Sequence, residues 1–187
     1  PEVMRCTGFL NSHADEIYRL REPDDQYLVG TSEVALAGMH ENEILDLGNG
    51  PLRYCGWSSC YRREAGAAGK DTSGIIRVHQ FDKVEQFVIC KPEESWDMHE
   101  YMIKNSREFY ESLGLPYHVV NIVSGALNNA AAKKYDLEGW FPGYNAYREL
   151  VSCSNCTDYQ SRAMEIRCGS TKKANEDKKY VHMLNST

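Results

Sequence analysis

The sequence predicts an α+β fold, in which a largely antiparallel β-sheet is flanked by helices. Two observations support this class: segments with strand character outnumber helical ones, and short connections join neighbouring strands. Short connections favour antiparallel neighbours, because a parallel pair needs a long crossover. With 187 residues, of which 42% are hydrophobic, the chain can bury one sizeable core. We therefore treat residues 1–187 as one domain.

The first half of the chain predicts one helix and two long strands. A helix is expected over 31–45, because Thr31 can cap it with its hydroxyl and an acidic residue follows in the first turn. A strand is expected over Leu52–Glu64. The glycine-rich segment Ala65–Gly74 then connects it to a second strand over Ile75–Cys90, which makes a hairpin with a long loop.

The second strand of this hairpin carries charged residues among apolar ones. Alternation with a period of two gives one face consisting of Arg77, His79, Phe81, Lys83, Glu85 and Phe87. The opposite face consists of Val78, Gln80, Val84 and Val88. Charged side chains within a segment that otherwise has strand character indicate a functional site.

The second half predicts a long helix and a series of shorter elements. The helix is expected over Glu93–Leu113, because Gly114 can terminate it and Pro116 prevents its continuation. Its buried stripe is expected to consist of Met98, Met102, Phe109 and Leu113. Further strands are expected at 117–123, 135–140, 147–152, 164–168 and 179–184, with a short helix at 156–161.

Charge and cysteine usage limit the possible functions. The formal net charge of −6 argues against a surface that holds nucleic acid by bulk electrostatics, so any such contact should be local. The seven cysteines are an odd number without a dense disulfide framework, which fits a reducing compartment. No stretch approaches the roughly 20 apolar residues of a membrane span. A soluble, cytoplasmic protein is expected.

Arg62 and Glu64 are the first candidate pair for chemistry. On a strand ending at Glu64 they lie on one face, roughly 7 Å apart by strand rise. Such a cation and acceptor could hold a phosphate and an amine edge. An isolated Arg-x-Glu is more often a cross-strand ion pair, so the surrounding residues decide between these interpretations.

Those surroundings contain a specific series. Residues 60–64 read CYRRE, residues 66–74 read GAAGKDTSG, and residues 75–87 read IIRVHQFDKVEQF. Together they closely resemble motif 2 of class II aminoacyl-tRNA synthetases, here at about 52–87, and are most similar to the seryl enzymes. The resemblance implies that Arg62 contacts the α-phosphate of ATP, that Glu64 reads the adenine amine and that Phe81 stacks on the base.

The resemblance covers nearly the whole chain. The segments that carry it outside motif 2 are GTSE at 30–33, NIVSGALNNAAAKKYDLEGWFPG at 121–143, YRELVSCSNCTDYQSR at 147–162 and VHMLNST at 181–187. They look like the serine-binding segment, the remainder of the catalytic sheet and the segment that leads into motif 3. Their sequences are most similar to the eukaryotic cytosolic branch of the family. The resemblance implies a serine–tRNA ligase that forms seryl-adenylate from ATP and L-serine and transfers the seryl group to tRNA(Ser).

The same resemblance implies a set of site residues. ATP is expected to contact Arg62, Arg63, Glu64, Val78, His79, Gln80, Phe81, Glu149, Leu150, Val151 and Ser152, although alternation turns the Arg63 side chain away from Arg62. Serine is expected to contact Thr31, Ser32, Glu33, Arg62, Glu85, Asn185 and Thr187. Mg²⁺ is expected on Glu149 and Ser152, whose oxygens suit a hard cation. Catalytic roles are expected for Arg62, Glu64 and Glu149.

The resemblance also implies what lies outside the chain. Motif 1, which forms the homodimer interface of the family, is expected before Pro1, and motif 3 after Thr187. The N-terminal coiled-coil arm that grips the tRNA is not expected in these residues. The chain is therefore expected to be a fragment of a catalytic domain, inactive by itself.

Three alternatives remain open at this stage. Cys153 and Cys156 form a Cys-x-x-Cys pair at a strand-to-helix junction, where a dithiol redox centre is conceivable. The same pair could bind zinc, but only with Cys168 and His182 as distant further ligands. The third alternative is a catalytically inactive, synthetase-like binding protein, which would be expected to have lost its pocket residues.

Overall fold

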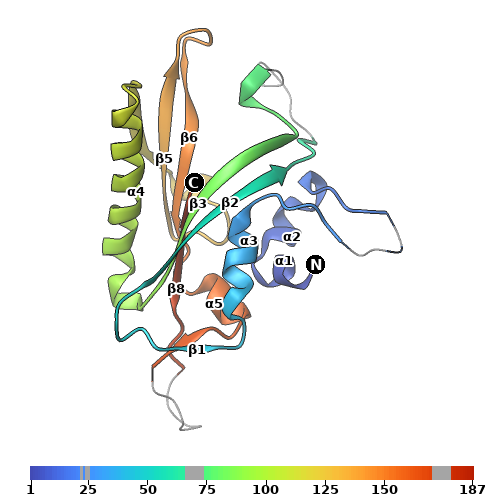
Figure 1. Cartoon of the computed structure of the whole chain (residues 1–187), viewed down its shortest axis with the longest axis vertical. Coiled ribbons are helices and arrows are strands. Elements are labelled where there is room, and N and C mark those ends of the chain that lie inside the picture. Colours follow the sequence, from blue (N-terminus) through green and yellow to red (C-terminus); the bar gives the residue numbers. More distant parts are fainter. Residues whose placement is uncertain (22, 24–25, 66–73, 170–177) are drawn as a thin grey trace.

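The structure is a computed structural model that describes residues 1–21, 23, 26–65, 74–169 and 178–187. Its elements form three layers (Figure 1). A long helix, α4, packs on one face of the central sheet, while the short helices α1, α3 and α5 lie on the other side. The predicted α+β class is confirmed.

The α-helices are α1 (Glu2–Cys6), α2 (Phe9–His13), α3 (Ser32–Ala37), α4 (Ser95–Ser112) and α5 (Tyr159–Ala163). The strands are β1 (Ile44–Leu45), β2 (Leu52–Tyr61), β3 (Gln80–Cys90), β4 (Tyr117–Asn121), β5 (Lys133–Phe141), β6 (Ala146–Asn155), β7 (Arg167–Cys168) and β8 (His182–Ser186). Single 3₁₀ turns lie at η1 (Ala14–Glu16), η2 (Gly38–His40), η3 (Gly74–Ile76), η4 (Pro92–Glu94) and η5 (Ser124–Ala126).

The central sheet has six strands in the order β2-β3-β8-β6-β5-β4, and every neighbouring pair is antiparallel. Strand β8 joins two hairpins, because it pairs with β3 only over Gln86–Cys90 and with β6 only over Cys153–Asn155. Beyond β8 the two hairpins separate, as Figure 1 shows. A small parallel pair, β1 and β7, lies apart from this sheet.

The two largest of the three apolar clusters among the described residues lie on opposite faces of the sheet. The core on the side of α3 and α5 contains Phe87, Ile89 and Met183, and the core under α4 contains Val88 and Leu184. Neighbouring residues of β3 therefore point into different cores, which explains why the end of this strand is a continuous apolar run. Both faces of the sheet are buried at the level of β8.

Helix α4 confirms one half of the predicted stripe and contradicts the other. Met98 and Met102 are buried, but Phe109 is 57% and Leu113 is 54% exposed. The buried face continues through Ser106 instead. The reason is that β3 and β6 have separated at this level, so that Phe109 borders an open cavity rather than a strand.

Three predicted boundaries were wrong. The helix expected over 31–45 ends at Ala37 and continues as a 3₁₀ turn at Gly38–His40, where Gly38 lies so close to Val3 of α1 that a Cβ atom would come within 2.6 Å of its side chain. The strand expected to reach Glu64 ends at Tyr61, since Glu64 adopts a φ of 51°, which a strand cannot accommodate. Its partner strand begins at Gln80 rather than at residue 75.

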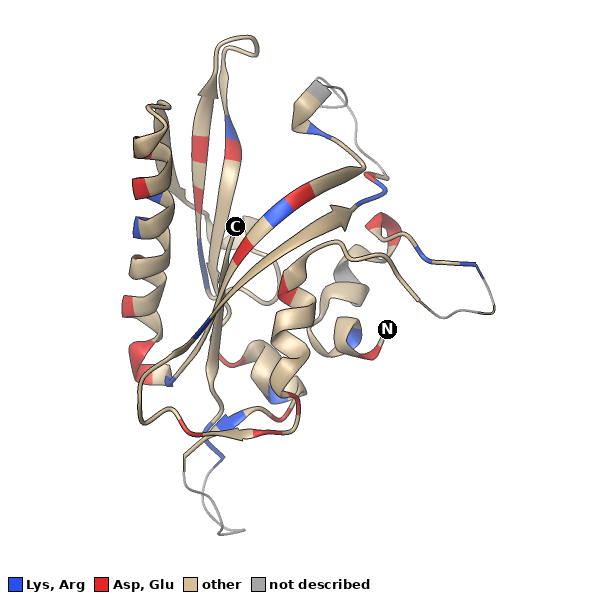
Figure 2. Ribbon diagram, viewed as in Figure 1, with Lys and Arg blue, Asp and Glu red and all other residues tan. Residues whose placement is uncertain are grey.

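The remaining predicted elements exist with shifted ends. Strand β8 begins and ends later than the expected 179–184, and only the end of the strand expected at 164–168 forms β7. The expected connection at 65–74 lies almost wholly outside the described residues. The described helices include none with the length and apolar composition of a membrane span. Figure 2 shows acidic and basic residues interspersed over the described part of the ribbon.

The core under α4 generates a stability prediction. Leu137 has no exposed surface in this core, so Leu137→Ala should lower the free energy of unfolding by about 2–5 kcal/mol through lost burial and a residual cavity. Urea unfolding measures this change. Leu113→Ala, at a position 54% exposed, is the matched control and should lower it by less than about 1 kcal/mol. Equal effects of the two substitutions would contradict this description of the core.

Candidate active site

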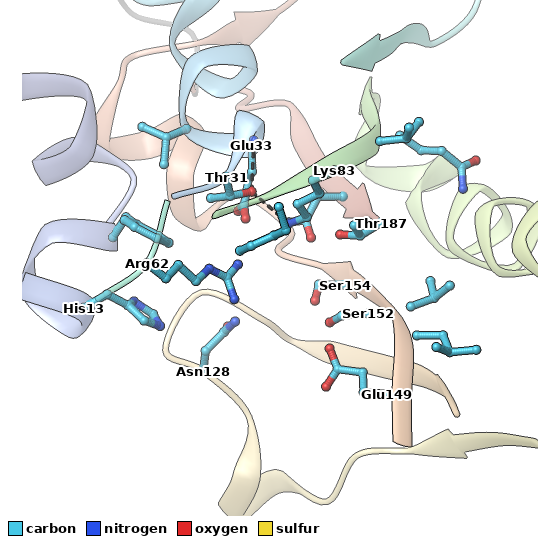
Figure 3. Close-up of a pocket in the computed structure, with 18 of the residues that line it drawn as sticks. His13, Thr31, Glu33, Arg62, Lys83, Asn128, Glu149, Ser152, Ser154 and Thr187 are labelled. Atoms are coloured by element: carbon cyan, nitrogen blue, oxygen red, sulfur yellow. Dashed lines mark hydrogen bonds between the residues drawn. The ribbon is translucent and has the colours of Figure 1, made fainter. Parts of the chain in front are cut away.

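A cavity of about 1090 Å³ lies where the two hairpins separate. Its size is at the upper end of ligand-binding pockets. Figure 3 shows side chains from α3, β3, β6 and the segment after β2 converging on it. The sequence-predicted site residues that line it are Thr31, Glu33, Arg62, Glu64, Val78, Phe81, Glu149, Leu150, Val151, Ser152, Asn185 and Thr187.

Five predicted residues do not line this cavity. Ser32 and Glu85 are buried behind its wall. Arg63 instead borders a second cavity of about 340 Å³ near α2, and its N–H donates to the carbonyl of Glu16 at 2.7 Å. His79 contacts Tyr18 with its ring, and Gln80 is exposed. The peripheral position expected for Arg63 agrees with this placement.

The hydroxyl of Thr31 organises one wall of the cavity. It accepts the N–H of Glu33 at 3.3 Å and so caps α3, as the sequence predicted. It also donates to Oε2 of Glu85 at 3.1 Å and accepts from Nζ of Lys83 at 2.9 Å. A hydroxyl has one donor and two acceptor sites, so these three contacts use its full capacity. Thr31 therefore contributes to the wall by fixing other groups.

Glu85 and Lys83 form an ion pair beneath this wall. The distance from Nζ to Oε2 is 3.0 Å, and the side chains are 0% and 12% exposed respectively. Oε1 of Glu85 is buried and has no hydrogen-bond partner among the described residues. A buried carboxylate oxygen without a donor is costly. A ligand that brings a donor to this oxygen would remove that cost.

Glu33 adds a second carboxylate to the same region. Its Oε1 accepts from Nε2 of Gln160 at 2.8 Å. Loss of hydration raises the pKa of Glu33, and the negative charge of nearby Glu85 raises it further, against the opposing effects of Gln160 and Lys83. The wall is therefore short of positive charge, which favours a cationic ligand. Gln160 was not predicted, because no local pattern connects it with a residue so far away in the sequence.

Arg62 brings a positive charge to the cavity beside the segment that leads into α3. Its Nε donates to the carbonyl of Gly30 at 3.2 Å, and its guanidinium carbon lies 5.2 Å from the centre of the Phe81 ring. Figure 3 shows the guanidinium turned into the cavity. One hydrogen bond and one ring contact thus fix the direction of a permanent positive charge.

Glu64 reaches the cavity by a different route from the one predicted. Strand alternation cannot place it beside Arg62, since β2 ends before both residues. The positive φ of Glu64 turns the chain, and its carboxylate forms an ion pair with Arg77. Both members of this pair line the cavity.

A β-bulge brings Glu149 to the cavity. Leu137 pairs with Val151 but Glu138 pairs with Glu149, so that Leu150 is an extra residue in β6. In a regular strand Glu149 and Ser152 would point to opposite faces, because they are three positions apart. The bulge shifts the alternation, and Figure 3 shows Glu149, Ser152 and Ser154 pointing into the same space.

The corner around Glu149 offers oxygen ligands. Loss of hydration raises the pKa of Glu149 although the residue is open to the cavity, and the negative charge of Asp136 adds to this shift. Asp136 pairs in register with Ser152 and forms an ion pair with Lys134 at 3.2 Å. A carboxylate and a hydroxyl on one face fit Mg²⁺. The described residues contain no cluster of three His, Cys, Asp or Glu side chains that could hold a metal, so a cation here would need further ligands from a bound molecule.

The Cys-x-x-Cys pair lies in the core. Cys153 and Cys156 are buried, and burial raises the pKa of Cys153 to about 12 and that of Cys156 well above its usual value. A redox centre needs a thiolate, which these environments oppose. Neither the redox nor the zinc alternative gains support from this arrangement.

These thiols provide a direct test. In the native protein at about pH 8, Cys153 and Cys156 should not react with Ellman's reagent on the timescale of minutes, because their raised pKa values keep them protonated. Exposed Cys55 is the internal control and should react rapidly. Peptide mapping of the labelled protein identifies the sites. Rapid labelling of Cys153 would support the redox alternative.

Comparison with known proteins gives a consistent result. Residues 17–187 match the family described as the tRNA synthetase class II core domain (G, H, P, S and T). The chain is 70% identical over 167 residues to the serine–tRNA ligase of Bifidobacterium longum strain DJO10A, which covers 89% of this chain and 39% of that protein.

Two solved structures are also similar. The cytoplasmic serine–tRNA ligase of Naegleria fowleri in complex with AMP gives a TM-score of 0.92 at 55% identity, over 99% of this chain and 44% of that one. The seryl-tRNA synthetase of Pyrococcus horikoshii complexed with ATP gives 0.88 at 51% identity, over 97% and 41%. The chain therefore spans about two fifths of the length of these relatives.

Proposed function

The chain belongs to the family of class II tRNA synthetase core domains, and we propose that it carries the adenylate-forming site of a serine–tRNA ligase. The observation that carries this proposal is the convergence on one cavity of Glu33 from α3, Arg62 from the segment after β2 and Glu149 from β6. Similar proteins with this name, two of them seen with AMP or ATP, support the same conclusion.

The proposed reaction has two steps. A carboxylate oxygen of serine attacks the α-phosphorus of ATP, the bond from this phosphorus to the pyrophosphate oxygen breaks, and seryl-adenylate forms. A ribose hydroxyl of tRNA(Ser) then attacks the seryl carbonyl carbon, the bond from this carbon to the phosphate oxygen breaks, and AMP leaves while the proton of the hydroxyl passes to the AMP phosphate or to solvent. No covalent intermediate with the protein is needed, so the site acts by positioning the reactants and by stabilising charge.

Arg62 and Phe81 are proposed to hold the nucleotide. The fixed guanidinium of Arg62 suits an α-phosphate, on which negative charge develops during attack. The ring of Phe81 offers a stacking surface for adenine, and Glu64 an acceptor for its amine. Val78, Leu150 and Val151 supply apolar walls around these groups.

Glu149 and Ser152 are proposed to hold Mg²⁺ together with phosphate oxygens of ATP. Their oxygens share one face only because of the bulge at Leu150. When bound, the ion would neutralise charge on the phosphates and orient them. The acidic corner formed with Asp136 explains why a cation is favoured there.

The amino-acid subsite is proposed to lie at the wall formed by Thr31 and Glu33, with the buried carboxylate of Glu85 directly behind it. Two close carboxylates suit the ammonium group of serine, and a buried acceptor suits its hydroxyl. Asn185 and Thr187 are proposed to close this subsite from the end of β8. Ser32 is buried beside it and contributes to packing of α3.

We further propose that the activity belongs to a longer enzyme, because the similar proteins are more than twice as long as this chain. A cytoplasmic location is proposed from the cytoplasmic enzyme among them, and a homodimer from the resemblance to a family whose motif 1 forms a dimer interface. The intact enzyme should catalyse serine-dependent exchange between ATP and pyrophosphate, whereas the 187 residues alone should show little exchange. An intact protein that binds serine and ATP without exchange would favour the alternative of an inactive binding protein.

Arg62→Ala in the intact enzyme should reduce the rate of adenylate formation by about 10²–10³ with little effect on serine binding, because its charge matters most in the transition state. Pre-steady-state measurement of adenylate formation tests this. Arg53→Ala, at an exposed position of β2, is the control and should leave the rate unchanged. An unchanged rate in Arg62→Ala would remove this residue from the mechanism.

Glu85→Gln should weaken serine activation strongly and leave the KM for ATP nearly unchanged, since it keeps the shape of the side chain but removes its charge. It should also narrow the preference for serine over alanine, which in sites of this kind can reach about 10⁴–10⁵. Exchange assays with both amino acids measure this. Glu108→Gln, exposed on α4, is the control, and wild-type serine kinetics in Glu85→Gln would refute the assignment.

A further inference from the structure

Lys83 lines the cavity and contacts the buried carboxylate of Glu85. Its side chain is 12% exposed, and Figure 3 shows it beside Thr31 and Glu33. Its ammonium group contacts Oε2 of Glu85 at 3.0 Å and Oγ1 of Thr31 at 2.9 Å. The sequence placed this lysine on the face of Glu85 but indicated no role for it.

The contacts of Lys83 make the two oxygens of Glu85 unequal. Oε2 accepts both from Lys83 and from Thr31, whereas Oε1 has no partner among the described residues. Two donors on one oxygen fix the rotation of the carboxylate group. The positive charge at 3.0 Å also offsets the cost of a fully buried carboxylate.

Other charges face this pair from each neighbouring element. Glu33 approaches from α3, Arg62 from the segment after β2 and Glu149 from β6. Lys83 is the cation of this group that is in direct contact with Glu85. Without Lys83, the negative charges of Glu85 and Glu33 would lie close together with less positive charge to offset their repulsion.

We propose that Lys83 is a positioning residue for serine: together with Thr31 it holds Oε2 of Glu85, so that Oε1 is the carboxylate oxygen left for the hydroxyl or ammonium group of the substrate. This proposal rests on the assignment of serine to this subsite. A purely structural ion pair would give a different result, because its loss would lower stability without raising the KM for serine more than the KM for ATP.

The test is Lys83→Met in the intact enzyme, which keeps the length of the side chain and removes its donors. The KM for serine should rise about tenfold or more, the KM for ATP should change by less than about twofold, and the preference for serine over alanine should fall about tenfold. Lys104→Met, exposed on α4, is the matched control and should change none of these values. Absence of exchange in the wild-type enzyme would contradict the proposed function instead.

A second variant covers the case in which Lys83→Met does not fold. Lys83→Arg keeps the charge, but its larger, planar guanidinium holds its donors in a rigid fork, unlike the compact ammonium group of lysine. We expect Lys83→Arg to fold, to raise the KM for serine about threefold or more and to leave the KM for ATP unchanged. If Lys83→Met also folds, its KM for serine should be higher than that of Lys83→Arg. A wild-type KM for serine in either variant, or equal increases for serine and ATP, would overturn the proposal.

Discussion

The site depends on one buried carboxylate, Glu85, and on the two groups that hold it. Thr31 and Lys83 fix one of its oxygens, and the same Thr31 hydroxyl caps α3. One cluster therefore sets the position of α3 against β3 and orders the wall of the cavity. Removing one partner of such a buried, hydrogen-bonded pair leaves an uncompensated charge. The packing of α3 on the sheet and the geometry of the subsite therefore depend on the same three side chains.

The shortness of β8 provides the space for a ligand. Because β8 pairs with β3 and β6 only near their buried ends, the outer parts of both hairpins are free to separate and to line the cavity. The bulge at Leu150 then turns Glu149 toward it. Gly139 permits this packing, since a Cβ atom there would lie 2.5 Å from Cδ1 of Leu150. Backbone irregularities thus place the polar groups that regular strands would hide.

The sequence predicted the fold class, the antiparallel sheet and most elements, because alternation, caps and glycine signals are local. Twelve of the seventeen site residues that the motif resemblance implied line the cavity, because a motif identifies residues that are far apart in the chain but close together in the fold. It missed the end of β2, because a positive φ at Glu64 has no signature in a non-glycine residue. It missed the Gln160 contact with Glu33 and the role of Lys83, which become visible only when α5, α3 and β3 are brought together.

The most direct test of this account is a crystal structure of the intact enzyme with a non-hydrolysable analogue of seryl-adenylate. The account predicts that a donor of the seryl group lies within hydrogen-bond distance of Oε1 of Glu85, while Lys83 and Thr31 remain on Oε2. It also predicts the phosphate-like group at Arg62 and the adenine beside Phe81. A seryl group bound elsewhere, with Oε1 of Glu85 still unpaired, would contradict it.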